Sequence, residues 1–166
     1  MKKIILLTTI LCSSIPAMAE TLRLSVPGMV CQMCVQGMRK TFKKDVKGKA
    51  DQKIIVDLEK KYVFLNELKE GALDTKSAIL KTPNTGYHAR VAQLGSTAAV
   101  TLPMGKIKVD EIKKRLSSEK IFNFVKVEKI KAGKDEFDYV EIKLKEDIDW
   151  EKIVKMLEKI FPEIKV

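Results

Sequence analysis

Two cysteines, Cys31 and Cys34, lie two residues apart in the segment VPGMVCQMCVQGM, residues 26–38. A pair with this spacing can form a disulfide, supply half of a zinc site, act as a redox centre, or hold one soft metal ion between two thiolates. Each of these chemistries makes different demands on the rest of the chain, so the other residues help to choose among them.

The residues available around the pair favour the clamp for a soft ion. A structural zinc site needs four ligands, usually two such pairs, and the chain after residue 19 offers only this pair and one histidine, His88. A disulfide across two residues closes a very short loop and constrains the unfolded chain little. Two thiolates suit an ion that accepts two nearly collinear sulfur donors, such as Cu(I) or Hg(II). We therefore expect Cys31 and Cys34 to bind one such ion.

Two alternatives stay open at the level of sequence. A thiol–disulfide exchange factor also has its cysteine pair at the start of a helix, where the helix dipole and the backbone amides lower a thiol pKa. Thioredoxin-like centres usually have an aromatic residue before the first cysteine, whereas Val30 stands there in this chain. The other alternative is a pure interaction protein whose metal site has decayed.

The first nineteen residues have the features of a secretory signal peptide. Two lysines precede a short apolar stretch, residues 4–11, and the sequence AMA at residues 17–19 fits the small-x-small cleavage pattern. Cleavage after Ala19 would remove Cys12, which follows a leucine too bulky for lipoprotein processing. No later stretch is apolar enough to span a bilayer. We therefore predict an exported protein, periplasmic in a cell with two membranes, with no stable membrane insertion.

The residues after the signal peptide predict a β-α-β-β-α-β order over residues 21–94. Alternation of polar and apolar residues predicts strands, apolar residues at helical spacing predict helices, and Asp74 is a good N-cap. The expected strands cover residues 21–26, 51–59, 61–68 and 87–94, and the expected helices cover residues 34–44 and 74–82. This order is the split, ferredoxin-like arrangement, in which helices cover one face of a four-stranded antiparallel sheet.

The same order starts again after Gly95-Ser96. The expected strands are residues 97–103, 122–133, 137–147 and 163–166, and the expected helices are residues 108–119 and 149–161. The two halves thus repeat with a period of about 70 residues. In this register Cys31 and Cys34 align with Ile107 and Asp110, so the second copy keeps the frame without the thiols.

The sequence therefore predicts an α+β protein with two ferredoxin-like sandwiches in tandem. We expect a signal peptide at residues 1–19, a metal-binding domain at residues 20–94, and a degenerate ferredoxin-like domain without metal ligands at residues 96–166. This last part contains no cysteine and no histidine. We expect it to dock a partner or to stabilise the first domain.

The segment GMVCQMC, residues 28–34, resembles the GMxCxxC signature of heavy-metal-associated domains. The resemblance covers residues 21–94 and includes the strand before the signature, the order of the elements, and the sequence TGYHARV at residues 85–91. With the signal peptide, it is strongest toward the periplasmic mercury-binding members of this family, and copper chaperones are related to them. The resemblance implies a metal carrier or scavenger that uses Cys31 and Cys34 as ligands and passes its ion on by thiolate exchange.

Three neighbours are expected to support the pair. Gly28 is expected to give the loop its flexibility, and Met29 is expected to pack beneath the loop. Tyr87 matches the family position beside the metal loop, where it would either shield the ion and hydrogen-bond near it or simply pack against the loop. His88 follows in the same expected strand, so alternation would direct its side chain away from Tyr87.

Charge and composition restrict the classes of partner. The formal net charge of +10 falls to about +8 when the two signal-peptide lysines are removed. The lysines alternate with acidic and apolar residues, and aromatic residues are few, so we expect solvated faces and no nucleic-acid surface. We expect a protein that is not an enzyme and whose partner is a membrane metal transporter or another metal-binding protein.

Overall fold

The computed structural model describes residues 20–164. The predicted signal peptide, residues 1–19, lies outside the described residues, as do residues 165–166. Within the described part, seven strands form one antiparallel sheet on which five α-helices pack. Of these five helices, none has both the length and the apolar character needed to cross a membrane.

The elements follow the predicted order through most of the chain. The strands are β1 (Leu22–Ser25), β2 (Ile54–Asp57), β3 (Tyr62–Leu65), β4 (Val91–Leu94), β5 (Thr97–Pro103), β6 (Phe122–Ala132) and β7 (Asp135–Leu144). The helices are α1 (Gln32–Phe42), α2 (Ala50–Lys53), α3 (Thr75–Lys81), α4 (Val109–Ser117) and α5 (Trp150–Ile160), and the 3-10 helices are η1 (Thr82–Thr85) and η2 (Pro162–Ile164). Asp74 caps α3 as predicted, because its side chain accepts a hydrogen bond from the amide of Ser77.

One continuous sheet joins the two halves of the chain, in the order β2-β3-β1-β4-β5-β7-β6. β4 pairs with β1 on one side and with β5 on the other. Gly95 and Ser96 form the two-residue turn of the β4–β5 hairpin, with Leu94 opposite Thr97 and a positive φ of 54° at Gly95. The α+β class is thus confirmed, but the prediction of two separate four-stranded sandwiches in tandem is wrong.

The prediction of a strand at residues 163–166 is wrong for residues 163 and 164, the two that the structure describes. Pro162–Ile164 forms the 3-10 helix η2. The edge of β5 that this strand would have paired with is already occupied by β4. A strand of the first half therefore completes the sheet of the second half, and the second half contributes only β5, β6 and β7.

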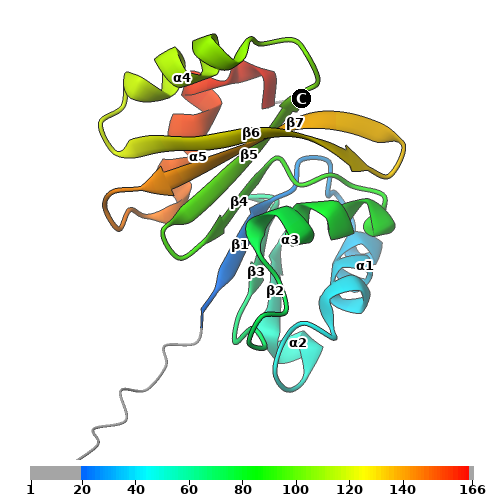
Figure 1. The fold of residues 1–166 in the computed structure, drawn as a ribbon. Coiled ribbons are helices and arrows are strands. Elements are labelled where there is room, and N and C mark those ends of the chain that lie inside the picture. Colours follow the sequence, from blue (N-terminus) through cyan, green and yellow to red (C-terminus); the bar gives the residue numbers. More distant parts are fainter. Residues whose placement is uncertain (1–19, 165–166) are drawn as a thin grey trace, which may run out of the picture.

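Two pairs of helices cover opposite faces of this sheet (Figure 1). Adjacent residues of a strand point to opposite faces, and in β4 the side chain of Ala92 lies in the core beneath α1 and α3. Its neighbour Val91 lies in the core beneath α4 and α5. Tyr139 and Val140 of β7 are divided between the two cores in the same way.

Each core therefore contains residues from both halves of the chain. Tyr139 of β7 is buried against α3, where its hydroxyl is 2.8 Å from the hydroxyl of Thr75. In the other core, Tyr62 of β3 packs edge-on against Trp150 of α5, with ring centroids 5.6 Å apart. That residues 20–94 and residues 96–166 are two domains, each able to fold when expressed alone, stays a prediction.

The longest strands form the β6–β7 hairpin, which crosses the sheet toward the first half (Figure 1). β6 is one outer edge of the sheet, and its pairing with β7 is interrupted by a bulge between Phe124 and Lys126. The hairpin turns at Gly133-Lys134, between the paired residues Ala132 and Asp135. This tip lies against Pro83 of η1.

The shared cores predict that both halves unfold together. Replacing Tyr139 by Phe should lower the free energy of unfolding by about 1–2 kcal/mol, because the buried Thr75 hydroxyl loses its partner. The midpoints of urea unfolding should coincide when followed by Trp150 fluorescence and by far-ultraviolet circular dichroism, although Trp150 lies in the other core.

Tyr62→Phe is the matched control, because the Tyr62 hydroxyl makes no hydrogen bond among residues 20–164. We expect it to change the free energy of unfolding by less than about 0.5 kcal/mol. Two separate unfolding transitions would contradict the sharing of the cores.

Candidate metal centre

The two cysteines lie where the loop after β1 enters α1. Gly28 has a φ of 94°, a conformation that side chains disfavour, and a Cβ atom there would lie 3.5 Å from the ring of Tyr87. Met29 is fully buried in the core below the loop, as expected. Cys31 is the N-cap residue of α1, and Cys34 lies in its first turn. The chain thus turns sharply at Gly28 and presents both thiols at the start of the helix.

The two thiols differ in exposure and lie close together. Cys31 is exposed, Cys34 is only 3% exposed, and their Sγ atoms are 3.0 Å apart. A disulfide would need about 2.05 Å between the sulfurs. A linear ion with two metal–sulfur bonds of about 2.3 Å would need about 4.6 Å. The pair is therefore a dithiol, and Cys31, which faces solvent, is the residue that can move outward to admit an ion.

Tyr87 lies over the buried thiol. It comes from the segment between η1 and β4, and its Oη is 3.0 Å from the Sγ of Cys34. Burial by itself would raise the pKa of Cys34, but hydrogen bonds with Cys31 and Tyr87, and with the backbone at Val30 and Cys31, lower this pKa from 9.0 to about 7. The bond with Cys34 in turn raises the pKa of Tyr87 to about 12, since the phenol is held as the donor to the thiolate. A large fraction of Cys34 is therefore thiolate near neutral pH, the form that binds metal.

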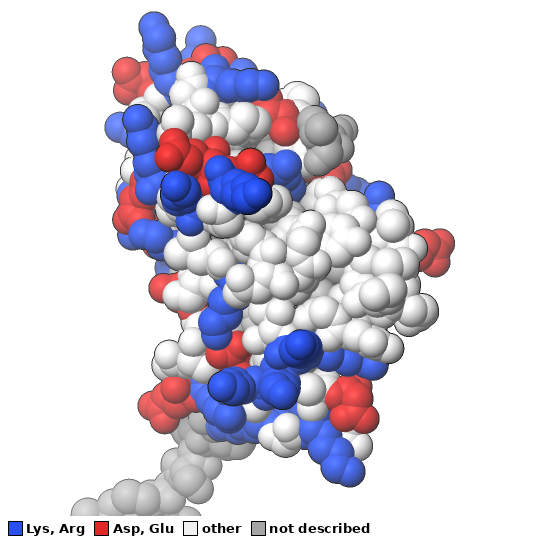
Figure 2. All heavy atoms as spheres, turned by 90° about the vertical axis from the view of Figure 1, so that its right-hand side faces the viewer, with Lys and Arg blue, Asp and Glu red and all other residues white. Residues whose placement is uncertain are grey.

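The surface around Cys31 carries no charge. Residues 24–38 and 82–87 contain no Asp, Glu, Lys or Arg, although a third of the whole chain is charged. Val30 and Met33 flank the exposed thiol with 73% and 80% of their surface exposed. Figure 2 views the side on which α1 lies in Figure 1 and shows a broad uncharged area with basic residues gathered below it. An approaching protein would thus meet an apolar rim around the thiol.

His88 does not face the cysteines. Its Nε2 is 3.0 Å from a carboxylate oxygen of Asp135, and its ring packs on Phe137 with centroids 5.3 Å apart. The predicted direction is confirmed, but the predicted reason is wrong, because β4 begins at Val91 and His88 precedes the strand. Among residues 20–164, no three His, Cys, Asp or Glu side chains gather into a group that could hold a metal ion. In the described part, Cys31 and Cys34 thus have no third ligand of these types beside them.

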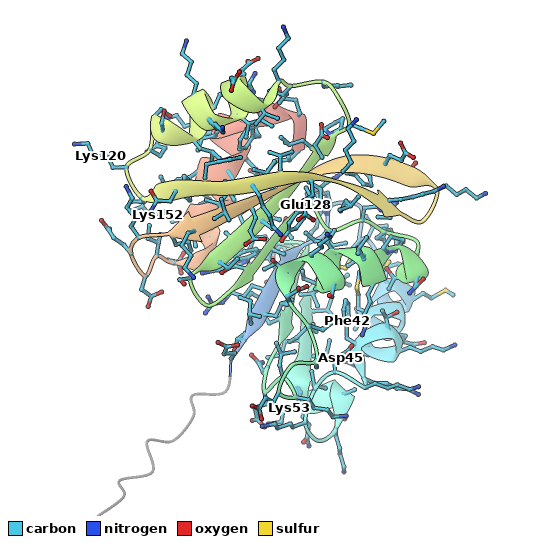
Figure 3. All side chains as sticks on the ribbon, in the orientation of Figure 1. Phe42, Asp45, Lys53, Lys120, Glu128 and Lys152 are labelled. Atoms are coloured by element: carbon cyan, nitrogen blue, oxygen red, sulfur yellow. The ribbon has the colours of Figure 1, made fainter. Side chains whose placement is uncertain are left out.

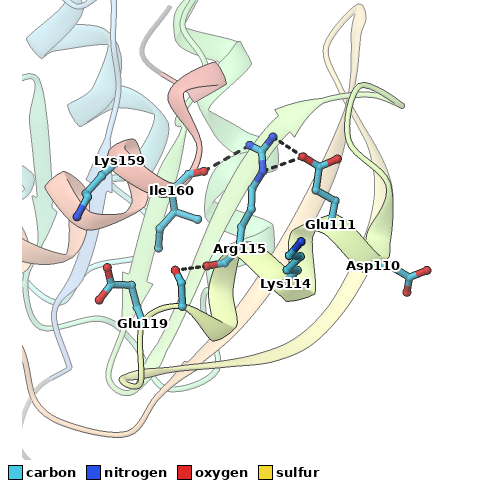
Figure 4. Close-up of a pocket in the computed structure, with 8 residues that line it drawn as sticks. Asp110, Glu111, Lys114, Arg115, Glu119, Lys159 and Ile160 are labelled. Atoms are coloured by element: carbon cyan, nitrogen blue, oxygen red, sulfur yellow. Dashed lines mark hydrogen bonds and ion pairs between the residues drawn. The ribbon is translucent and has the colours of Figure 1, made fainter.

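A hollow of about 880 Å³ lies elsewhere, between α4 and the end of α5 (Figure 4). Its lining includes Asp110, Glu111, Lys114, Arg115, Ser118, Glu119, Lys159 and Ile160. Arg115 crosses its wall and bonds to Glu111 at 2.7 Å, to Glu163 at 3.0 Å, and to the carbonyl of Ile160 at 3.4 Å. Arg115 is thus paired with two carboxylates, and none of the predicted site residues lines the hollow.

The structure brings all five predicted site residues together, namely Cys31, Cys34, Gly28, Met29 and Tyr87. No pattern in the sequence indicated that residues 133–137 contact residues 83–90, because those two segments belong to different halves of the repeat. Comparison with protein-family models, with curated proteins and with solved structures gave no match to this chain. The geometry of the two thiols is therefore the feature of this chain that points to a function.

The hydrogen bond between Cys34 and Tyr87 predicts a pH dependence that one substitution should change. In the reduced protein, the pKa of Cys34 is about 7 when folded and near 9 when unfolded, so the unfolded chain binds more protons between these values. The free energy of unfolding should therefore rise as the pH increases from about 7 to about 9, and the gain should be lost as the pH falls through 7.

Tyr87→Phe should raise the pKa of Cys34 and flatten this rise, because the phenyl ring cannot donate to the thiolate. Thiolate absorbance in a Cys31→Ser background follows Cys34 alone, and Tyr62→Phe controls for the loss of a distant hydroxyl. An unchanged titration midpoint in Tyr87→Phe would show that the phenol does not stabilise the thiolate.

Proposed function

We propose that this chain binds one soft metal ion, Cu(I) or Hg(II), between Cys31 and Cys34 and passes it on by thiolate exchange. The observation that carries the proposal is an exposed thiol 3.0 Å from a buried thiol whose pKa is about 7, both at the start of one helix. The ion is the cargo of the protein, and the chain itself makes and breaks no covalent bond of a substrate.

The unequal exposure of the two thiols suggests an order for the transfer. Cys31 faces solvent and can reach an ion that is still held by the thiolates of another protein. Cys34 then completes the coordination from inside the loop, where the phenol of Tyr87 stabilises its charged form. Each new sulfur–metal bond replaces one bond to the donor, and each cysteine that binds as a thiol releases its proton. Release to an acceptor follows the same steps in reverse.

The arrangement of residues 21–94 supports the resemblance to heavy-metal-associated domains. Here β2, β3, β1 and β4 lie side by side, with α1 and α3 on one face, which is the ferredoxin-like order. We propose that the chain is an exported member of that kind, periplasmic in a cell with two membranes, with the second half added through the β4–β5 hairpin. The uncharged rim formed by Val30 and Met33 fits a membrane metal transporter or another metal-binding protein with an apolar surface around its own thiols.

A thiol–disulfide exchange factor is the second candidate, because its chemistry would use the same dithiol. In such a factor the attacking thiolate must reach the disulfide of a substrate protein. In this chain the lowered pKa belongs to Cys34, which is 3% exposed and lies under Tyr87. The buried thiolate of Cys34 is therefore shielded from protein substrates, which favours the metal carrier.

The reduced protein, residues 20–166, should bind one Cu(I) or Hg(II) ion per chain. Cys31→Ser or Cys34→Ser should each weaken binding by more than about 100-fold, because a two-coordinate ion keeps only one ligand. Loss of a residue that merely supports a ligand typically costs about 10–100-fold. Competition against a chromophoric chelator measures the affinity, and mass spectrometry measures the stoichiometry. Met33→Leu is the control and should leave the affinity unchanged. Tight binding that survives the loss of both thiols would disprove the site.

A thiol–disulfide exchange factor should catalyse the reduction of protein disulfides, whereas a metal carrier should not. When the reduced protein is exposed to an oxidant without metal, we expect a Cys31–Cys34 disulfide to form, since the two sulfurs are already 3.0 Å apart. We expect no catalysis of insulin reduction beyond that of a small dithiol at equal concentration, because Cys34 cannot reach the substrate. Turnover well above the small dithiol would favour the exchange factor over the carrier.

A further inference from the structure

The second half contributes no cysteine or histidine, yet it contacts the segment that carries Tyr87. The tip of the β6–β7 hairpin lies so close to Pro83 that a Cβ atom on Gly133 would be 3.2 Å from the Cβ of Pro83. The same added atom would be 4.0 Å from the ring of His88. A side chain at this position would press on Pro83, and the φ of 69° at Gly133 also favours glycine.

Pro83 contacts the second half before Tyr87, and residues 88–90 contact it after Tyr87. Immediately after Tyr87, His88 is held by the carboxylate of Asp135 at 3.0 Å. Further along, the guanidinium of Arg90 lies over the ring of Phe137, 5.2 Å from its centroid. Thr101 of β5 donates its hydroxyl to the carbonyl of Ala89 at 3.1 Å.

The opposite directions of two neighbouring side chains make these contacts relevant to the thiol. Tyr87 points toward Cys34, and His88, the next residue, points toward the hairpin. The contacts that hold His88 against the hairpin therefore also restrict the backbone from which Tyr87 reaches Cys34. A hydrogen bond weakens steeply when its angle or distance changes, so a small displacement of this segment would be enough to lose it.

The hairpin is itself firmly attached to the first half. Glu128 of β6 lies above α3 (Figure 3), where it forms ion pairs with Lys76 of α3 and with Lys126. Tyr139 of β7 is buried and bonded to Thr75 at the start of α3. The hairpin is thus fixed to α3 at its middle and contacts the Tyr87 segment at its tip.

We propose that the β6–β7 hairpin of the second half positions Tyr87 against Cys34. Gly133, Asp135 and Phe137 are positioning residues, since they touch the segment that carries the phenol and make no contact with the thiols. The significance of this role rests on the proposed metal carrier, in which Cys34 is a ligand. The contact between Tyr87 and Cys34 can be measured without metal, so the test stands apart from that proposal.

Gly133→Ala tests the role of the tip, and Gly105→Ala is a matched control. The two glycines have φ values of 69° and 68°, but an added Cβ at Gly105 meets nothing within 4 Å. Both substitutions therefore strain the backbone alike, and only Gly133→Ala presses on Pro83. The measurement is the NMR signal of the Cys34 Cβ in reduced, metal-free protein, with Tyr87→Phe defining the change that accompanies loss of the phenol.

We expect Gly133→Ala to shift the Cys34 signal in the same direction as Tyr87→Phe, and Gly105→Ala to leave it in place. Once Tyr87→Phe is present, adding Gly133→Ala should cause no further shift, because the hairpin acts through the phenol. A Cys34 signal that stays unchanged in Gly133→Ala would overturn the proposal. An equal shift in the Tyr87→Phe background would overturn it too.

Asp135→Ala provides a second test in case Gly133→Ala does not fold. The side chain of Asp135 is 61% exposed, so its removal leaves the cores intact while it frees His88. We expect a smaller shift of the Cys34 signal and about tenfold faster hydrogen exchange at the amides of residues 87–89. Glu136→Ala, at the exposed neighbouring position, should change neither measurement. No change in Asp135→Ala, or equal changes in both variants, would contradict the role of the contact between His88 and Asp135.

Discussion

The architecture depends on the position of β4, which is hydrogen-bonded on both sides. It is paired with β1 of its own half and, through a two-residue turn, with β5 of the other half. The crossover from β1 through α1 to β2 runs toward one edge of the sheet, and the crossover from β5 through α4 to β6 runs toward the other. β1 and β5 point the same way, and such crossovers are right-handed. The two helix pairs must therefore lie on opposite faces, as the cores require.

This arrangement explains how a half without ligands comes to lie beside the thiols. If each half had its own closed sheet, the second would contact the first only through a linker. In the joined sheet, β6 and β7 have 11 and 10 residues, whereas the strands of the first half have four each. The excess length extends past the shared strands and folds over the face that α3 covers. The region around Tyr87 is thereby enclosed by residues far apart in the sequence.

Local features of the structure were predictable from the sequence, and the joining of the halves was not. Asp74 caps its helix, and residues 97–103 form a strand with the predicted bounds, because these features depend on nearby residues. The side chains at the cysteine pair also lie as expected, since one loop and one helix position them. The Gly95-Ser96 pair is a hairpin signal, but the repeat favoured its interpretation as a boundary. The contact of Gly133 with Pro83 follows from the shared sheet and has no local signal.

The bulge in β6 has a consequence for the behaviour of many copies in one solution. β6 is a long outer strand, and an outer strand with free amide and carbonyl groups is a template for edge-to-edge association. The bulge between Phe124 and Lys126 interrupts the regular repeat of those groups, and exposed lysines at positions 126, 129 and 131 repel an identical strand. At high local concentration the protein is thereby protected against aggregation along this edge, although Val125 leaves an apolar side chain exposed there.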